Sequence, residues 1–149
     1  MITLEAGDKA PEFSAEDQDG NKLNLSDFKG KKLVLFFYPK ASTPGCTAEA
    51  CNLRDNWENF EKKGYAILGV SADSKKRQQN FKNKYELPFP LLADENKDVI
   101  NAYGVWGPKK FMGKEYEGIH RTTFIIDENS KIEEVIQKVK TKEHSAQII

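Results

Sequence analysis

Cysteine is scarce in this chain of 149 residues, which contains only Cys46 and Cys51. Two cysteines are too few for a disulfide framework, and a chain of this length buries enough surface to fold without one. An excess of charge of one sign is also lacking, because 23 lysines and arginines balance 23 aspartates and glutamates. This balance gives no electrostatic support for binding nucleic acid or an anionic membrane, so we expect neither as a partner.

Long hydrophobic runs are lacking too. The longest, from Leu33 to Tyr38, is far shorter than the roughly 20 residues that span a bilayer. The first residues, Met1 to Asp8, show no basic segment followed by an apolar one, so they do not resemble a secretory signal. We therefore expect a cytoplasmic protein. The length predicts one domain over residues 1–149.

The apolar pattern predicts two hairpins near the ends of the chain. Phe13 to Leu25 is typical of two short strands around Asp19-Gly20, which favours a tight turn. Two further strands are expected at Thr122–Ile126 and Lys131–Lys138, joined through residues 127–130. We therefore expect antiparallel pairing at both ends of the chain.

Between the hairpins, buried strands alternate with helices. Apolar runs predict strands, and helical spacing of Ala50, Leu53, Trp57 and Phe60 predicts a helix that ends at Gly64. The expected elements are a helical turn at 26–30, strands at 31–38, 65–70 and 91–92, helices at 44–64, 75–85 and 97–103, a long structured loop at 104–120, and a last helix from Lys142. This order predicts an α/β fold with a central mixed β-sheet flanked by helices and an N-terminal β-hairpin. It is compatible with a thioredoxin-like fold, but a fold alone assigns no function.

Residues 39–51 join a buried strand to a helix, and reactive groups gather at the carboxyl ends of such strands. Thr43 suits the N-cap of that helix, and Pro44 suits its first position. Cys46 then falls in the first turn, where free backbone N–H groups and the helix dipole favour a thiolate over a thiol. Because the thiolate is the nucleophile, Cys46 is a candidate reactive residue.

Cys51 follows five residues later in the expected helix. Five residues correspond to a rise of about 7.5 Å and a rotation of about 140°, which separates the Cα atoms by roughly 8.6 Å. A disulfide accepts at most about 7 Å between Cα atoms. An intact helix therefore forbids a Cys46–Cys51 disulfide, and forming one requires the first turns to unwind.

The residues alone leave other interpretations of the cysteines open. Both are compatible with small, inert core residues. A thioredoxin-type dithiol has the spacing Cys-x-x-Cys, which is absent here. A zinc site would have to recruit His120 and His144, and the four residues show no recognised ligand spacing.

The segment Thr43-Pro-Gly-Cys46-Thr-x-Glu-Ala-Cys51 resembles the peroxiredoxins, specifically the bacterioferritin comigratory protein (Q-type) subfamily. The Pro-x-x-x-Thr-x-x-Cys pattern of that family is met by Pro39, Thr43 and Cys46. The resemblance covers nearly the whole chain, with further matching stretches at 6–13, 17–20, 36–40, 69–71, 90–94, 103–107 and 118–127.

The resemblance implies a thiol-dependent peroxidase that reduces hydrogen peroxide and organic hydroperoxides. Cys46 would be the peroxidatic cysteine, which becomes a sulfenic acid, and Cys51 the resolving cysteine, which condenses with it to an intramolecular disulfide. A thioredoxin-like or glutaredoxin-like donor would reduce that disulfide. The resemblance implies no metal or organic cofactor, and a protein that is a monomer or at most a weak dimer.

The same resemblance assigns supporting roles. Thr43 would hydrogen-bond the peroxide through its hydroxyl, and Pro39 would shield the sulfenic acid. Arg121 matches an arginine that stabilises the thiolate and polarises the substrate oxygens. The chain has three arginines, Arg54, Arg77 and Arg121, and only the resemblance selects among them. Glu49 matches a glutamate or glutamine near the site.

Two alternative functions use the same cysteines. A thiol–disulfide oxidoreductase would exchange the Cys46–Cys51 pair with protein thiols, although the spacing disfavours it. A redox-dependent holdase or sensor would bind a partner after oxidation exposes apolar surface.

Overall fold

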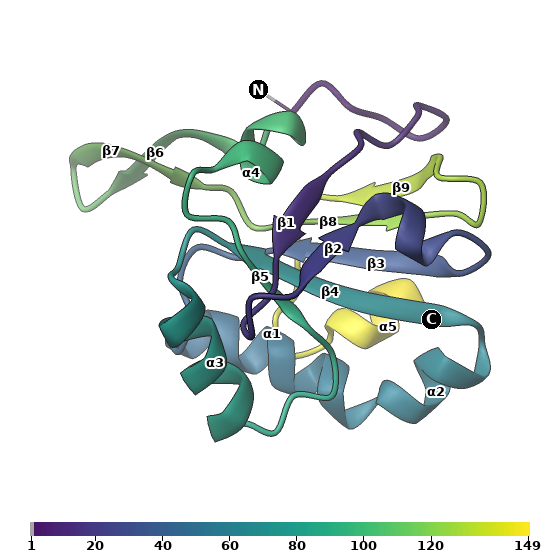
Figure 1. Ribbon diagram of the computed structural model, residues 1–149. Helices are drawn as coiled ribbons and strands as arrows, with labels where there is room; N and C mark the ends of the chain where they lie inside the picture. The colour runs from purple at the N-terminus through teal and green to yellow at the C-terminus, as the bar shows by residue number, and fades with distance from the viewer. Residues whose placement is uncertain (1) are drawn as a thin grey trace.

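The computed structural model describes residues 2–149 and has a central five-stranded sheet in the order β5-β4-β3-β8-β9 (Figure 1). The strands are β3 Lys32–Phe37, β4 Tyr65–Ser71, β5 Leu91–Ala93, β8 Thr122–Ile126 and β9 Ile132–Ile136. β3 pairs in parallel with β4 and antiparallel with β8, so that Leu35 lies between Leu68 and Phe124. The predicted mixed sheet is therefore confirmed, with β3 at its centre.

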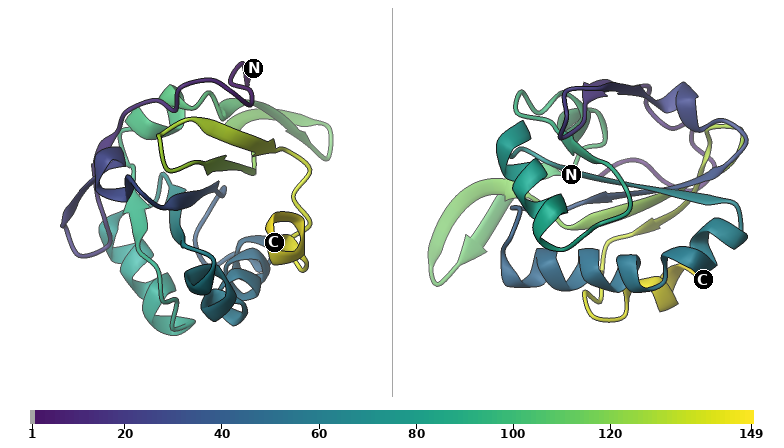
Figure 2. Two further views of the ribbon diagram at one scale, coloured as in Figure 1. Left: turned by 90° about the vertical axis from the view of Figure 1, so that its right-hand side faces the viewer. Right: turned by 60° about the horizontal axis from the view of Figure 1, so that its bottom comes forward.

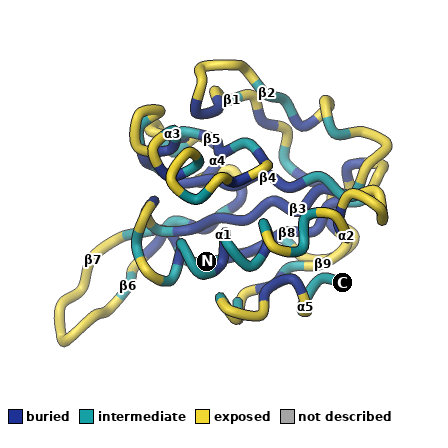
Figure 3. The backbone as a smooth tube through the Cα atoms, turned by 90° about the horizontal axis from the view of Figure 1, so that it is seen from below, coloured by how far each residue is buried: buried dark blue, intermediate teal, exposed yellow. Residues whose placement is uncertain are grey.

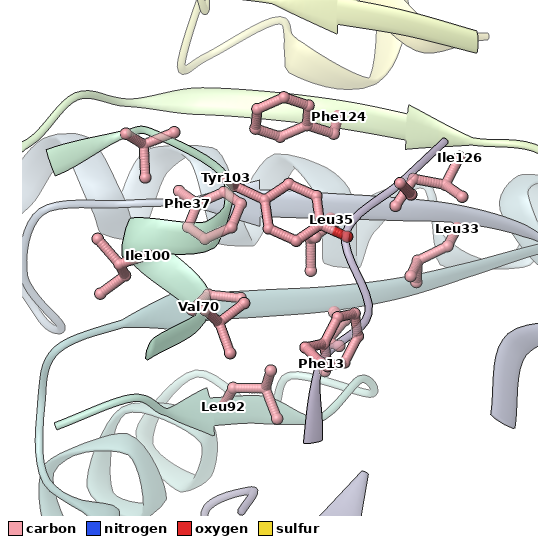
Figure 4. Packing of buried hydrophobic residues seen from close by; sticks show 14 of the residues in the cluster. Phe13, Leu33, Leu35, Phe37, Val70, Leu92, Ile100, Tyr103, Phe124 and Ile126 are labelled. Atoms are coloured by element: carbon pink, nitrogen blue, oxygen red, sulfur yellow. The ribbon is translucent and has the colours of Figure 1, made fainter. Parts of the chain in front are cut away.

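The side chains of β3 alternate between two apolar clusters, one on each face of the sheet. Leu33, Leu35 and Phe37 pack into the first cluster, together with Phe13 and Phe124 (Figure 4). The elements on this face are β1 Ser14–Glu16, β2 Lys22–Asn24, the 3₁₀ turn η1 Leu25–Phe28 and α4 Asp98–Ala102 (Figure 1). The predicted N-terminal hairpin is the antiparallel pair of β1 and β2.

On the other face of the sheet, the second cluster contains Val34, Phe36 and Tyr38 and is covered by the remaining helices. These are α1 Pro44–Asp55, α2 Trp57–Lys62, α3 Lys75–Lys84 and α5 His144–Ile148 (Figure 2). Because both faces are covered, β3 is buried on both sides, as its continuous apolar sequence indicated. Within residues 2–149, no helix combines the length and the apolar character needed to cross a membrane.

The prediction of a single helix that ends at Gly64 is wrong, because the chain forms two helices that meet at Asn56. The side-chain amide of Asn56 donates to the carbonyl of Asn52 at 2.9 Å, while its backbone N–H donates to Leu53. The side chain thus takes the acceptor that a continuous helix would give to the backbone N–H, and the helix breaks there. The end at Gly64 is confirmed, with a left-handed φ of 79°.

The prediction of a long loop at 104–120 is also wrong, because this segment forms the hairpin of β6 Trp106–Phe111 and β7 Lys114–Ile119. Met112 and Gly113 occupy its two-residue turn, with φ of 51° and 80°. The hairpin projects from the body of the molecule and is largely exposed at its tip (Figure 3). A projecting ribbon buries neither face well, so its sequence lacks the apolar alternation that marks a strand.

Candidate active site

The loop after β3 brings the chain to the start of α1, with Thr43 at the N-cap position and Pro44 at the first helical position, as predicted. The predicted side-chain capping bond is not formed. Instead, the Thr43 hydroxyl donates to the carbonyl of Lys40 at 2.8 Å. The Thr43 oxygen therefore keeps its lone pairs free to accept a further hydrogen bond at the N-terminus of α1.

Cys46 lies in the first turn of α1 and is 1% exposed. Its sulfur accepts a hydrogen bond from Nη2 of Arg121 at 3.4 Å. Arg121 precedes β8, the strand paired with β3, so the sheet brings the two residues together although they are far apart in the sequence. The guanidinium and the helix N-terminus both stabilise negative charge on this sulfur.

Arg121 also binds Glu49, its Nη1 donating to Oε1 at 2.8 Å. Burial disfavours the charge of Arg121, but Cys46 and Glu49 outweigh that effect and raise its pKa above the ordinary value. Gly45 leaves room for this cation, since a Cβ there would lie 3.1 Å from Nη2. The guanidinium is therefore a fixed positive charge between the sulfur and the carboxyl group.

Cys51 lies on the same helix and is partly buried, and both cysteines are free. Burial raises the pKa of the Cys51 thiol, and the nearby positive charge of Arg54 opposes this only in part. Burial therefore favours the neutral thiol of Cys51, and among residues 2–149 no cation is hydrogen-bonded to it as Arg121 is to Cys46.

The β6–β7 hairpin borders two open cavities beside this site. The first, of about 350 Å³, is lined by Pro39 together with Trp106 and Ile119. The second, of about 390 Å³, is lined by His120 and Arg121. These cavities put Pro39 and Arg121 within reach of solutes on the two sides of the hairpin base.

Lys109, on β6, is a residue that the sequence analysis missed. It lines both cavities, and its Nζ donates to the carbonyl of Ile119 at 2.9 Å. Burial lowers the pKa of Lys109, the charge of Arg121 lowers it further, and Cys46 opposes both. Lys109 is thus a second cation within electrostatic reach of Cys46, and assigning its segment to a loop hid it.

Known proteins are similar to this chain over nearly its whole length. Residues 6–135 match the model of the AhpC/TSA family. The chain is 51% identical over 144 residues to Peroxiredoxin Bcp of Escherichia coli K12, covering 97% of this chain and 92% of that protein. It is 46% identical over 148 residues to Peroxiredoxin Bcp of Bacillus subtilis, covering 99% and 94%.

Among solved structures, one similar protein is the bacterioferritin comigratory protein of Xanthomonas campestris, studied for its alkyl peroxide reduction activity. The match has a TM-score of 0.89 and 33% identity, and covers 97% of this chain and 94% of that one. The predicted thioredoxin-like fold is confirmed by this group of structures.

Proposed function

This chain belongs to the AhpC/TSA family and is a peroxiredoxin, a thiol-dependent peroxidase, and from that membership we propose how its own residues carry out the reaction. The observation that carries the proposal is the hydrogen bond of 3.4 Å from Arg121 to the sulfur of Cys46 at the start of α1. It supports the assignment of Cys46, rather than Cys51, as the sulfur that reacts as an anion.

In the first step, the Cys46 thiolate attacks the terminal oxygen of a hydroperoxide. The S–O bond forms as the O–O bond breaks, which yields a sulfenic acid and an alkoxide or hydroxide that takes a proton from water. Arg121 stabilises the negative charge on the attacking and departing atoms. We assign Thr43 as the acceptor of the peroxide O–H and Pro39 as the shield of the reacting oxygen, since it lines the cavity at the base of the hairpin.

In the second step, the sulfur of Cys51 attacks the Cys46 sulfenic acid. An S–S bond forms, and the sulfenic hydroxyl leaves as water with the thiol proton. Both residues lie in α1, whose geometry keeps them too far apart to bond. The helix must therefore unwind between them before the disulfide forms.

In the third step, an external dithiol reduces the disulfide. We propose a thioredoxin-like or glutaredoxin-like donor, because two-electron exchange with a dithiol restores both free cysteines. Dependence on such a donor supports a cytoplasmic location, where thiols are kept reduced.

We also propose that residues 1–149 act as one domain and as a monomer or weak dimer. The two apolar clusters share the faces of one sheet, which is the arrangement of a single folding unit. Within residues 2–149, the exposed large apolar side chains are confined to the β6–β7 hairpin, at Phe111, Met112 and Tyr116. That patch is small for a stable interface between subunits.

For the substrate, we propose hydrogen peroxide and organic hydroperoxides. The similar Xanthomonas campestris protein was studied for alkyl peroxide reduction, and the cavity beside Pro39 has room for a substituent on the peroxide. The relative rates with hydrogen peroxide and with an alkyl hydroperoxide measure this preference directly.

The test is the intact mass of the reduced protein after one equivalent of hydrogen peroxide. The unmodified chain is expected to lose two hydrogens, and Cys51→Ser to gain one oxygen, because its sulfenic acid has no partner. Cys46→Ser is the matched control and should keep its mass. Unchanged masses in both the unmodified chain and Cys51→Ser would contradict the proposal.

Arg121 is tested by separating the steps. Arg121→Ala should slow oxidation of Cys46 by peroxide by about a hundredfold, because it removes the charge that the thiolate and the transition state share. Reduction of the disulfide by a dithiol should slow much less, since that step does not use the peroxide oxygens. Equal slowing of both steps would remove Arg121 from this role.

A further inference from the structure

His144, the first residue of α5, lies directly behind the reactive helix. Its side chain is completely buried, with Nε2 2.7 Å from Oγ1 of Thr123 and 3.4 Å from Oε2 of Glu49. Thr123 belongs to β8, two residues beyond Arg121. The imidazole therefore joins the C-terminal helix to the carboxyl group that holds the guanidinium, although it does not touch Cys46 itself.

The proton positions on His144 follow from its other neighbour, Gln147. The amide nitrogen of Gln147 donates to the carbonyl of Lys138, and its oxygen accepts from the backbone N–H of Lys140, which fixes the orientation of the amide. That same oxygen lies 2.8 Å from Nδ1 of His144. Nδ1 must therefore carry a hydrogen, and Nε2 is the nitrogen that gains or loses a proton toward Glu49.

The two carboxyl oxygens of Glu49 differ in their hydrogen bonding. Oε1 accepts from Arg121, whereas Oε2 has no hydrogen-bond partner among residues 2–149 and faces Nε2 of His144. Burial raises the pKa of Glu49 to about 7, against the opposing charge of Arg121. Burial lowers the pKa of His144, the bond to Gln147 opposes this, and the charge of Arg121 lowers it further.

Because Oε2 of Glu49 and Nε2 of His144 lie 3.4 Å apart, a proton on either atom lies between the two groups, and we treat Glu49 and His144 as a pair that holds one proton or none. The charged groups that face the pair are Arg121, from the segment before β8, and behind it Cys46, from α1. When the pair holds one proton, the charge of Arg121 is balanced by the Cys46 thiolate alone. When the pair holds none, the Glu49 carboxylate competes with the thiolate for the same guanidinium.

We propose that His144 is a positioning residue for peroxide reduction: it holds Glu49 from the side opposite Arg121, and the proton shared by Glu49 and His144 leaves the guanidinium charge to the Cys46 sulfur. The inference rests on the proposed role of Cys46 as the peroxidatic residue. It adds the C-terminal helix to the parts of the fold that set the reactivity of this sulfur.

The test compares His144→Phe and His144→Gln with Ser145→Ala from pH 5 to 9. Ser145 is on the same helix, and its hydroxyl bonds the carbonyl of Asn52 rather than Glu49, so its loss controls for loosened docking of α5. Two quantities are measured for each variant: the rate constant of Cys46 oxidation by hydrogen peroxide, and the rate of Cys46 alkylation by iodoacetamide, which reports the thiolate without peroxide chemistry.

For the unmodified protein, the oxidation rate should rise with thiolate formation and fall on the alkaline side as the pair loses its proton. His144→Phe should oxidise about tenfold more slowly at pH 7, with its alkylation curve moved to higher pH. His144→Gln still offers Glu49 a polar partner, so it should keep most of the oxidation rate at pH 7. The alkaline decrease of that rate should, however, occur at a different pH from that of the unmodified protein. Ser145→Ala should stay within about twofold of the unmodified protein, because the hydroxyl that it removes bonds Asn52 and contacts neither Glu49 nor Arg121.

Three results would overturn the inference. Both His144 variants could match the unmodified protein in both curves, or Ser145→Ala could lose as much rate as His144→Phe, which would assign the effect to helix docking. If His144→Phe does not fold, an unchanged alkaline fall in His144→Gln overturns the inference by itself. Failure of the proposed function is distinguishable, because an unmodified protein inert to peroxide would still give alkylation curves that test the positioning role.

Discussion

At the scale of single residues, the approach of Arg121 to the sulfur depends on the absence of a side chain at Gly45. A Cβ at this position would lie 3.1 Å from Nη2, which is closer than nine in ten real Cβ contacts. The guanidinium has little freedom to retreat, because it is bonded to both Cys46 and Glu49.

Gly45→Ala is therefore expected to push the guanidinium from the sulfur by a few tenths of an ångström and to slow oxidation of Cys46 by roughly three- to tenfold. The free energy of unfolding should not fall, because alanine favours the helix more than glycine does. Rapid-mixing kinetics with hydrogen peroxide and a urea titration measure the two quantities. An unchanged oxidation rate in the variant would show that Arg121 has more room than its two bonds indicate.

Individual site residues differed in how far the sequence could predict them. The positions of Cys46 and Thr43 at the start of α1 follow from local rules, since the start of a helix after a buried strand is readable from nearby residues, but only the resemblance gave Thr43 a role in the site. Arg121 was selected by resemblance alone, because its contact with Cys46 exists only after the sheet has formed. Glu49 has the helical spacing of a surface residue, yet it is completely buried. The role of His144 depends on how α5 docks, and no local pattern reports that.

At the scale of secondary-structure elements, α5 is bonded to α1 beside Cys51. The side chain of Asn52 accepts from the backbone N–H of Ser145 at 2.7 Å and donates to the carbonyl of Lys142 at 3.0 Å. These bonds hold the residue next to Cys51, at the end of the segment that must unwind for Cys51 to reach Cys46. The docked helix therefore opposes formation of the disulfide.

Asn52→Ala is expected to accelerate disulfide formation after the sulfenic acid has formed by roughly three- to tenfold, because two bonds that hold α1 are lost. The first oxidation step should not change. Rapid mixing resolves the two steps, and the yield of sulfinic acid at excess peroxide should fall. Asn59→Ala, an exposed neighbour in the adjoining cavity, is the control. Slower or unchanged disulfide formation in Asn52→Ala would mean that the docked helix does not limit the unwinding.

The elements that the sequence predicted well are those buried on one or both faces. β3, β4 and β8 were recognisable from apolar runs, and α3 was expected at 75–85, close to its observed bounds Lys75–Lys84. β6 and β7 were missed because a projecting hairpin carries polar residues on both faces. The break between α1 and α2 was missed because the bond from the Asn56 side chain leaves the apolar spacing unchanged.

At the scale of the whole molecule, the buried carboxyl group of Glu49 makes stability depend on pH. Its pKa rises from the ordinary value of 4.5 to about 7 in the folded state, so the folded state binds more protons than the unfolded state between these values. Its favourable contribution is complete below pH 4.5 and is lost as the pH rises through about 7. His144 acts in the opposite sense, because its lowered pKa costs stability as the pH falls below its ordinary value of 6.5.

Glu49→Gln removes the first of these effects and keeps the shape of the side chain. The free energy of unfolding of the variant, relative to the unmodified protein, should therefore increase between pH 5 and pH 8, by at most about 3 kcal/mol. Urea titrations of the reduced proteins at the two pH values measure the difference. A difference that does not change with pH would mean that Glu49 titrates alike in the folded and unfolded states.

The turn of the β6–β7 hairpin has a consequence for any peroxide titration of this protein. The thioether of Met112 is 86% exposed there, and peroxides convert such a group to a sulfoxide with the gain of one oxygen. This product has the same mass as a sulfenic acid, but a dithiol donor does not reverse it. Met112→Leu thus separates oxygen carried by the hairpin from oxygen that passes through the catalytic cycle. In the unmodified chain, the oxygen on Met112 remains when a dithiol has reduced the cysteines again. The extra mass of one oxygen therefore shows that the protein was exposed to peroxide earlier.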